Sequence, residues 1–214
     1  MRGKTHLAIG AAIGGAAALY YPFSWTHAAI YVTVAGFSAL SPDLDGPSIL
    51  NSKLSKASKV VRKLILWLGT LSVGAVLALY LWKRTMIPEL TTAAFLLFFL
   101  GQIATQGALR NLLSSIMGCI AMFYGWKLGM DWLIGLGIYV AIAPWLKHRG
   151  LTHTIWAMLL WGFIASGLEN ALQIEGVMAV AIVGYFSHLL ADTFTPRGVK
   201  WLYPLMQTTF RIRL

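Results

Sequence analysis

Apolar runs separated by short polar stretches occupy most of this 214-residue chain. Two runs, 64–82 and 90–109, contain no charged residue and are long enough to cross a hydrocarbon core of about 30 Å as α-helices. Six weaker runs complete the pattern: 7–21, 27–40, 111–126, 132–146, 151–168 and 176–191. The pattern predicts an all-α fold, a polytopic integral membrane helix bundle with about eight membrane segments, some of them short or re-entrant.

The composition agrees with a membrane location. Hydrophobic residues make up 58% of the chain and charged residues 11%, with a mean hydropathy of +0.70, which excludes an ordinary soluble domain. In so apolar a chain, the net charge of +10 favours loops that face anionic lipid headgroups over a nucleic-acid surface. We therefore expect one integral membrane domain over residues 1–214, with membrane lipids and no nucleic acid as partners. The oligomeric state stays open.

Basic residues predict the orientation. Arg2 and Lys4 precede the first run as in a signal peptide, but no small-residue cleavage site follows, so a retained helix is predicted. If the N-terminus is cytoplasmic and all eight runs cross, 14 of the 17 Lys and Arg residues, Arg213 among them, lie in the cytoplasm. The outer side receives Lys83, Arg84 and Lys127. This asymmetry satisfies the positive-inside rule and predicts that both termini are cytoplasmic.

Histidine and aspartate residues gather at the ends of the apolar runs. Four of the five histidines and three of the seven acidic residues form four clusters: His6, Asp43 with Asp45, His148 with His153, and His188 with Asp192. The predicted topology puts all seven on the cytoplasmic side, whereas His27 falls outside. Such groups are costly to bury in lipid, and they are ligands of zinc and manganese. The sequence therefore predicts a membrane-embedded site for one or two divalent ions, with zinc favoured over manganese.

Two clusters have informative spacing. His188 and Asp192 are four residues apart, which places both side chains on one helix face. His148 and His153 flank Gly150, which can break a helix and let both imidazoles turn toward one point. Arg149 lies between them and has a planar fork that suits a phosphate. The alternative interpretation of His188 and Asp192 is a polar pair at a helix end, and that of Arg149 is a positive charge at the membrane interface.

Two polar segments follow the second run: one is a candidate metal-binding turn, and the other is a candidate membrane-surface helix. In Ser-Pro-Asp-Leu-Asp-Gly, residues 41–46, Pro42 ends a helix, and two carboxylates follow. Asp43 is a candidate N-cap of the next helix as well as a ligand, so Asp45 is the favoured ligand. Residues 51–64 carry five basic side chains among apolar ones and predict an amphipathic helix on the cytoplasmic leaflet, which sets the topology or recruits an anionic lipid.

Taken in order, the motifs resemble a known family. Four motifs carry the resemblance: Thr-His-Leu-Ala-Ile-Gly from Thr5, Ser-Pro-Asp-Leu-Asp from Ser41, His-Arg-Gly-Leu-Thr-His from His148, and His-Leu-Leu-Ala-Asp-Thr-Phe-Thr-Pro-Arg-Gly-Val-Lys-Trp-Leu-Tyr-Pro from His188. Together they resemble the YdjM-like membrane-bound metal-dependent hydrolases. The resemblance spans Thr5 to Pro204, although 53–131 carries no family motif. This family is also described as LexA-regulated, which implies a link to the DNA damage response in some bacteria. Its similarity to zinc-dependent phospholipase C, an all-helical phosphoesterase, implies these metal ligands: His6, Asp45, His148, His153, His188 and Asp192.

The resulting hypothesis is a membrane-embedded, phospholipase-like metal-dependent hydrolase. It would act on a lipid-linked phosphoester at the cytoplasmic face of a bacterial inner membrane or archaeal cell membrane. Asp43 is the candidate general base or bridging carboxylate, and Arg149 the candidate phosphate holder.

Two alternatives stay open. The His-x-x-x-Asp spacing of His188 and Asp192 also matches the metal-free type 2 phosphatidic acid phosphatases, but the Pro-Ser-Gly-His and Ser-Arg segments of that family are missing. A non-enzymatic scaffold, transporter or stress-response protein could instead use the same residues to hold a structural metal.

Overall fold

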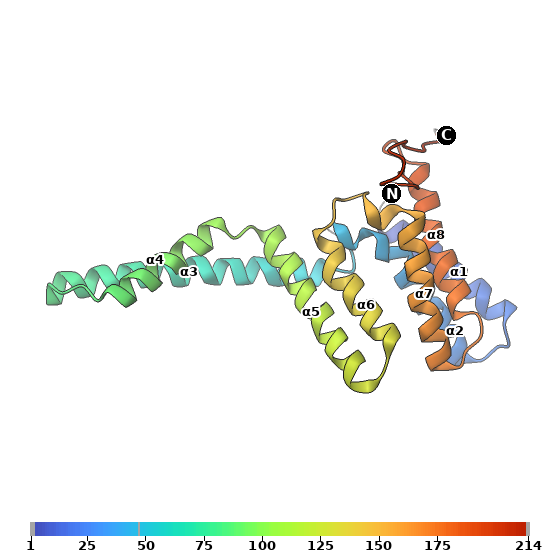
Figure 1. Cartoon of the computed structure of the whole chain (residues 1–214), viewed down its shortest axis with the longest axis horizontal. Coiled ribbons are helices and arrows are strands. Elements are labelled where there is room, and N and C mark those ends of the chain that lie inside the picture. The colour runs from blue at the N-terminus through green and yellow to red at the C-terminus, as the bar shows by residue number, and fades with distance from the viewer. Residues whose placement is uncertain (1–2, 47, 213–214) are drawn as a thin grey trace. The chain divides into compact units, whose positions relative to one another are not determined.

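The computed structural model describes residues 3–46 and 48–212 and is mainly helical (Figure 1). Arg2 and Arg213, which enter the charge asymmetry, lie outside the described residues. Within the described ranges no β-strand occurs, only an isolated bridge between Val199 and Phe210. The predicted all-α fold is confirmed. The α-helices are α1 (Gly3–Tyr20), α2 (Trp25–Leu40), α3 (Ser52–Lys83), α4 (Pro88–Ile103), α5 (Gln106–Leu128), α6 (Asp131–Ile142), α7 (Ile155–Leu172) and α8 (Val177–Thr193).

The chain divides into two compact units, which are described separately. The first contains Met1–Asn51 and Ser114–Leu214, and the second contains Ser52–Leu113. Three short 3₁₀ helices belong to the first unit: η1 (Ser41–Asp45), η2 (Ala143–Trp145) and η3 (Leu151–His153). The interpretation of residues 1–214 as one domain stays a prediction.

In the first unit, α2 packs against both α1 and α8, and α8 packs against α7 (Figure 1). Glycines permit the closest approaches. A Cβ atom on Gly10 of α1 would lie 2.8 Å from the carbonyl oxygen of Ala35, and one on Gly184 of α8 would lie 2.7 Å from the same oxygen. Neither position can therefore hold a larger residue without separating the helices. Close packing of α1 thus depends on Gly10, whereas Gly15 has open space around it.

Aromatic side chains fill the core between α6, α7 and α8. Trp161 and Tyr139 contact edge to face with ring centroids 5.0 Å apart, and Tyr185 is fully buried beside them. The indole nitrogen of Trp161 donates to the hydroxyl oxygen of Ser38 at 2.9 Å, so its polar atom is satisfied. This core supports the ends of α2 and α8, where two of the four His and Asp clusters lie.

The second unit is built on α3 and α4, which pack side by side. The structure differs here from the sequence-based expectation of a surface helix at 51–64 followed by a span at 64–82. Both stretches form one continuous helix, since no Gly or Pro interrupts the run between Ser52 and Leu68. With 32 residues, α3 is about 48 Å long and exceeds the hydrocarbon core.

The expected continuous span at 90–109 is wrong. The helix stops at Ile103 and restarts at Gln106, with a bend of 99° between α4 and α5. Two contacts explain the break: the Thr105 hydroxyl accepts a hydrogen bond from the Ala108 amide at 3.1 Å, and the Arg62 Nε donates to the Ala104 carbonyl at 2.9 Å. Side chains thus satisfy the backbone groups that the interrupted helix exposes.

Among the described residues, α3 and α7 are long and apolar enough to cross a membrane, and the bent α4–α5 pair brings the number to three if it acts as one span. The apolar helix α8 and the segment Asp131–Trp145 are shorter. Helices are thus present near all eight predicted segments, but an eight-fold crossing, and the orientation that depends on it, stays a prediction.

Candidate metal centre

The structure brings all seven predicted site residues together at one end of the first unit. They come from four segments: His6 from α1, Asp43 and Asp45 from η1, His148 and His153 from the stretch that ends in η3, and His188 with Asp192 from α8. Three overlapping groups have potential ligand atoms within 4.8 Å of one another: His6–Asp43–His188, Asp43–His148–His153 and His153–His188–Asp192. His27 takes no part, and its ring lies 3.3 Å from the Pro22 carbonyl.

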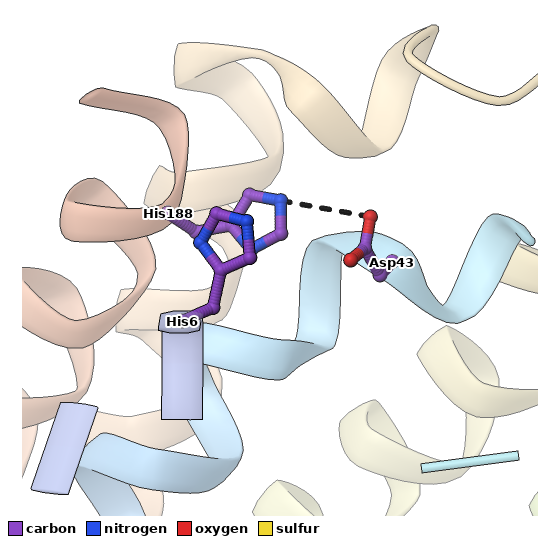
Figure 2. A group of neighbouring side chains, drawn as sticks. All are labelled: His6, Asp43 and His188. Atoms are coloured by element: carbon purple, nitrogen blue, oxygen red, sulfur yellow. Dashed lines mark ion pairs between the residues drawn. The ribbon is translucent and has the colours of Figure 1, made fainter. Parts of the chain in front are cut away.

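The turn after α2 directs its two carboxylates in different directions. Pro42 lies in the first turn of η1 and prevents α2 from continuing. A 3₁₀ helix rotates about 120° per residue, so side chains two residues apart point to different sides. Asp43 therefore faces the imidazoles of His6 and His188, as Figure 2 shows. Asp45 contacts the segment 148–152 instead.

Four atoms form the middle of the centre. The Nε2 atoms of His153 and His188 each lie 3.6 Å from the Asp43 Oδ1 atom and 4.0 Å from the Asp192 Oδ2 atom. A tetrahedral zinc site with bonds of about 2.0–2.1 Å needs ligand separations of about 3.4 Å. The observed spacing is thus slightly wider than a zinc tetrahedron, and small side-chain movements would close it.

The two imidazoles have bare nitrogens that point into this space. The Nδ1 atom of His188 lies 2.7 Å from the Ala39 carbonyl, which can only accept, so Nδ1 carries the proton. The Nε2 atoms of His153 and His188 are buried and have no hydrogen-bond partner. Buried polar atoms normally have partners, and a fixed Nδ1–H with a free Nε2 is the arrangement of a metal-binding histidine. The donor set therefore fits a divalent metal.

Asp45 stabilises this arrangement through the contacts of its carboxylate. Its carboxylate accepts hydrogen bonds from the Thr152 hydroxyl at 2.6 Å, from the Arg149 amide at 3.0 Å and, when the ring is protonated there, from the His148 Nδ1 at 2.7 Å. It also lies 3.4 Å from the His153 Nδ1. Burial opposes ionisation of Asp45, but the nearby His148 and His153 and the Thr152 hydroxyl outweigh it and hold its pKa well below the usual range.

These contacts reverse the preference between the two aspartates as ligands. Asp45 was the favoured ligand, yet its oxygens hold surrounding groups, and it belongs to none of the three ligand groups. Asp43 is in two of the three groups and keeps 21% of its side chain exposed. The geometry thus favours Asp43 for the centre and Asp45 for its support, while ligation by either aspartate stays a prediction.

His6 and His148 lie on two sides of the centre. The His6 ring stacks on His188 with centroids 3.9 Å apart, and its Nε2 lies 3.5 Å from the Asp192 Oδ1. Neither ring nitrogen of His6 has a hydrogen-bond partner. The side chain of His148 is 46% exposed, and its Nδ1 atom lies 2.7 Å from the Asp45 Oδ1 atom. Each of them, combined with Asp43, could complete a second ligand group.

Arg149 is engaged within the protein. Its Nη2 atom lies 2.6 Å from the Asp192 carboxylate, and its Nη1 donates to the Thr195 hydroxyl at 3.1 Å and the Gly198 carbonyl at 2.9 Å. The residue has a φ of 60°, a conformation that is uncommon for a side chain of this size. Arg149 thus orients Asp192 and ties η3 to the chain after α8. Its expected role as a phosphate holder stays a prediction.

A proton and a metal compete for the same nitrogens. Burial lowers the pKa of His153, but the neighbouring carboxylates of Asp43 and Asp45 outweigh burial and raise it. The close His–Asp pairs are therefore ion pairs when the imidazoles are protonated, and ligand pairs when they are neutral and a metal is bound.

Comparison with known proteins identifies the family. The family model described as "YdjM inner membrane protein" matches residues 1–214. The chain belongs to the YdjM inner membrane protein family. The predicted family resemblance and the membrane location are thereby confirmed. The family match does not identify a reaction.

Individual relatives match a shorter stretch. The chain is 36% identical over 67 residues to the uncharacterized protein YvsG of Bacillus subtilis (strain 168), which is 31% of this chain and 38% of that protein. It is 38% identical over 65 residues to the inner membrane protein YdjM of Escherichia coli (strain K12), 29% of this chain and 33% of that protein. The matched stretch thus spans a little over a third of each relative's length at most. No solved structure matches the chain.

Several supporting residues were not found by sequence reasoning. Thr152 donates to Asp45 and lies 3.0 Å from the His153 Nδ1. The buried Tyr185 hydroxyl donates to the Thr152 carbonyl and lies 3.0 Å from the Tyr139 hydroxyl. Thr152 precedes His153 directly, which was a usable signal. The tyrosines looked like ordinary apolar-run residues, and nothing in their spacing indicated a connection to the site.

Proposed function

We propose that this protein is a membrane-embedded metal-dependent hydrolase that cleaves a phosphoester in a lipid-linked substrate. The observation that carries the proposal is the convergence of two buried, bare imidazole nitrogens on two carboxylate oxygens at 3.6–4.0 Å. Buried groups of this kind are costly unless they are paired or coordinate a metal.

The proposed roles follow from the contacts. His153, His188 and Asp192 would hold one divalent ion, with zinc favoured and manganese second, and Asp43 would stand beside the position left open, as base or bridging carboxylate. His6 or His148, with Asp43 as the shared carboxylate, would hold a second ion. A divalent metal bound here would supply Lewis-acid polarisation of the phosphoryl group and activation of water.

Side chains of the protein would supply the base and would orient the ligands. Asp43 is the most exposed of the acidic groups in the centre, which suits a base that must reach water or substrate. Arg149 would fix Asp192 through its 2.6 Å contact and would meet a substrate phosphate only by giving up part of that pairing. Asp45 and Thr152 would keep His153 in the required tautomer.

The site would face the cytoplasm at the inner membrane, with both termini on the same side. The asymmetry of the basic residues supports this orientation. In a Cys119→Ala background, Lys56→Cys should resist an impermeant thiol reagent in intact cells, while Thr85→Cys should react. The reverse labelling would contradict the orientation. The link to the DNA damage response rests on the family resemblance alone and stays a prediction.

The second candidate is a non-enzymatic membrane protein with a structural metal. It is favoured by the nearly complete burial of His6, His153, His188 and Asp192, which leaves little room for substrate on that side. An enzyme needs an open coordination position, whereas a structural ion is closed by protein ligands.

Elemental analysis beside an activity panel tests the proposal. Purified wild-type protein should contain at least one zinc or manganese per chain, and His153→Ala should lose most of it, while the matched variant His27→Ala keeps it. If wild type and His153→Ala contain the same amount, the metal centre is refuted. If the metal is present, fully protein-coordinated and inactive on phospholipids and phosphodiester reporters, the structural role replaces the enzymatic one.

A further inference from the structure

An apolar groove of about 260 Å³ lies directly beside the centre, between the end of α6 and the beginning of α7. Its walls are formed mainly by aliphatic and aromatic side chains, among them Ile138, Ile142, Leu146, Leu151, Trp156 and Leu160. Its remaining lining residues are Tyr139, Ala143, Thr152, Thr154 and Ala157.

The polar side chains in the lining are already engaged within the protein. The Tyr139 hydroxyl pairs with the Tyr185 hydroxyl at 3.0 Å, and the Thr152 hydroxyl donates to Asp45. The Thr154 hydroxyl donates to the Leu151 carbonyl at 2.7 Å and accepts from the Ala157 amide. A polar ligand would find few hydrogen-bond partners here, so the lining suits a hydrocarbon chain.

The groove connects two environments. At its inner end, Thr152 belongs both to the lining and to the support of His153. At its rim, Ile142, Trp156 and Leu160 are 52%, 43% and 50% exposed, and the last two lie on α7, which is long and apolar enough to span a membrane. A ligand in the groove would therefore extend from the bilayer toward Thr152, the residue next to His153.

We propose that this groove seats one acyl chain of a membrane phospholipid whose phosphate is thereby presented to the His–Asp centre. The inference rests on the proposed function and adds the substrate class, a diacyl phosphoester lipid. Lipid tails are as apolar as the groove, so seating a chain gains packing contacts rather than hydrophobic burial. The groove is thus suited to orient a lipid that is already in the bilayer.

Photo-crosslinking of the full chain tests the seat. The protein would be reconstituted in phosphatidylglycerol vesicles with a trace of phosphatidylglycerol that carries a diazirine at one acyl end, and cross-links would be mapped by peptide mass spectrometry. We expect peptides with Ile142, Leu151 and Trp156 to be labelled severalfold above those of α3, which serves as an internal reference for lipid exposure.

Filling the groove should remove this excess. Ala157→Phe places a ring in the groove from α7, and Ile142→Trp does so from α6, which covers the case that the first variant fails to fold. Ala171→Phe is the matched control, because it makes the same change on an exposed position of α7 outside the groove. Groove labelling should fall to the α3 level in both filled variants and stay unchanged in the control.

The outcomes separate the two proposals. Metal content and hydrolysis of a water-soluble phosphodiester should be unchanged in Ala157→Phe, while hydrolysis of the lipid should fall severalfold. Groove labelling that is sensitive to Ala157→Phe in a protein without any hydrolytic activity would support the lipid seat and refute the enzyme. Labelling no higher than that of α3, labelling unaffected by the filling variants, or protein–protein cross-links at the groove would overturn the seat.

Discussion

The α3–α4 unit and the helices around the metal centre are both strongly apolar, yet they use their polar residues in opposite ways. On α3, Lys53, Lys56 and Lys59 are exposed, and the partly buried Arg62 caps a helix break. In the other unit, His153, His188 and Asp192 are buried and converge on one point. The strongest hydrophobic runs therefore belong to the unit with exposed basic residues, while the weaker, shorter runs adjoin the buried His and Asp residues.

This difference has an energetic reason. An exposed lysine costs little and contributes little beyond solubility and orientation. A buried carboxylate or imidazole loses its hydration and must be compensated by a partner or a metal. Changes in the centre should therefore have large and specific effects, and changes on α3 small ones.

The largest effect is expected for Asp43→Asn. If Asp43 accepts a proton in the reaction, hydrolysis of a soluble phosphodiester by metal-replete protein should fall roughly 10²- to 10⁴-fold. The thermal unfolding temperature should change little, since Asp43 is partly exposed. Asp131→Asn, an exposed acid at the start of α6, is the matched control. Equal activity of Asp43→Asn and wild type would remove Asp43 from the mechanism.

The next largest effect is expected for Asp45→Asn. The change removes the charge that accepts from Thr152 and faces the His153 Nδ1, so the imidazole loses its fixed orientation. Loss of such a supporting partner typically costs about 10- to 100-fold in metal affinity. Competition with a chromogenic chelator measures this affinity. A complete loss of metal would instead identify Asp45 as a direct ligand.

Tyr185→Phe probes the connection between the core and the centre. Its hydroxyl donates to the Thr152 carbonyl and pairs with Tyr139, and its removal leaves buried groups unpaired. We expect a loss of about 1–3 kcal/mol in the free energy of unfolding, measured by denaturation in detergent. Tyr20→Phe, at an 82% exposed position, should have no effect. Undiminished stability of Tyr185→Phe would separate the tyrosine pair from the site.

The smallest effect is expected in the α3–α4 unit. Arg62→Ala removes the donor to the Ala104 carbonyl and should cost roughly 1 kcal/mol. Metal content should stay at the wild-type level, as it should in Lys59→Ala. Loss of metal in Arg62→Ala would contradict the separation of roles between the two units.

Sequence patterns predicted the helical class, the membrane location and the family, because apolar run length and residue order are local properties. They also predicted the seven-residue set, since His and Asp at the ends of apolar runs are unexpected without a function. They did not predict the break between α4 and α5. That break depends on Arg62, a residue 42 positions away in the chain from the carbonyl it satisfies.

By itself, then, the sequence determined which residues can bind a metal, because donor chemistry belongs to the side chain. The tertiary structure decided what each residue faces. Asp43 faces His6 and His188, and Asp45 contacts His148 and Thr152, because a 3₁₀ turn directs them to different sides. Arg149 turns to Asp192, and His188 receives its tautomer from Ala39, a residue that only the packing of α2 on α8 brings to it. The orientation and the protonation state of these side chains depend on residues that are distant in the chain. Only the folded structure brings those residues into contact.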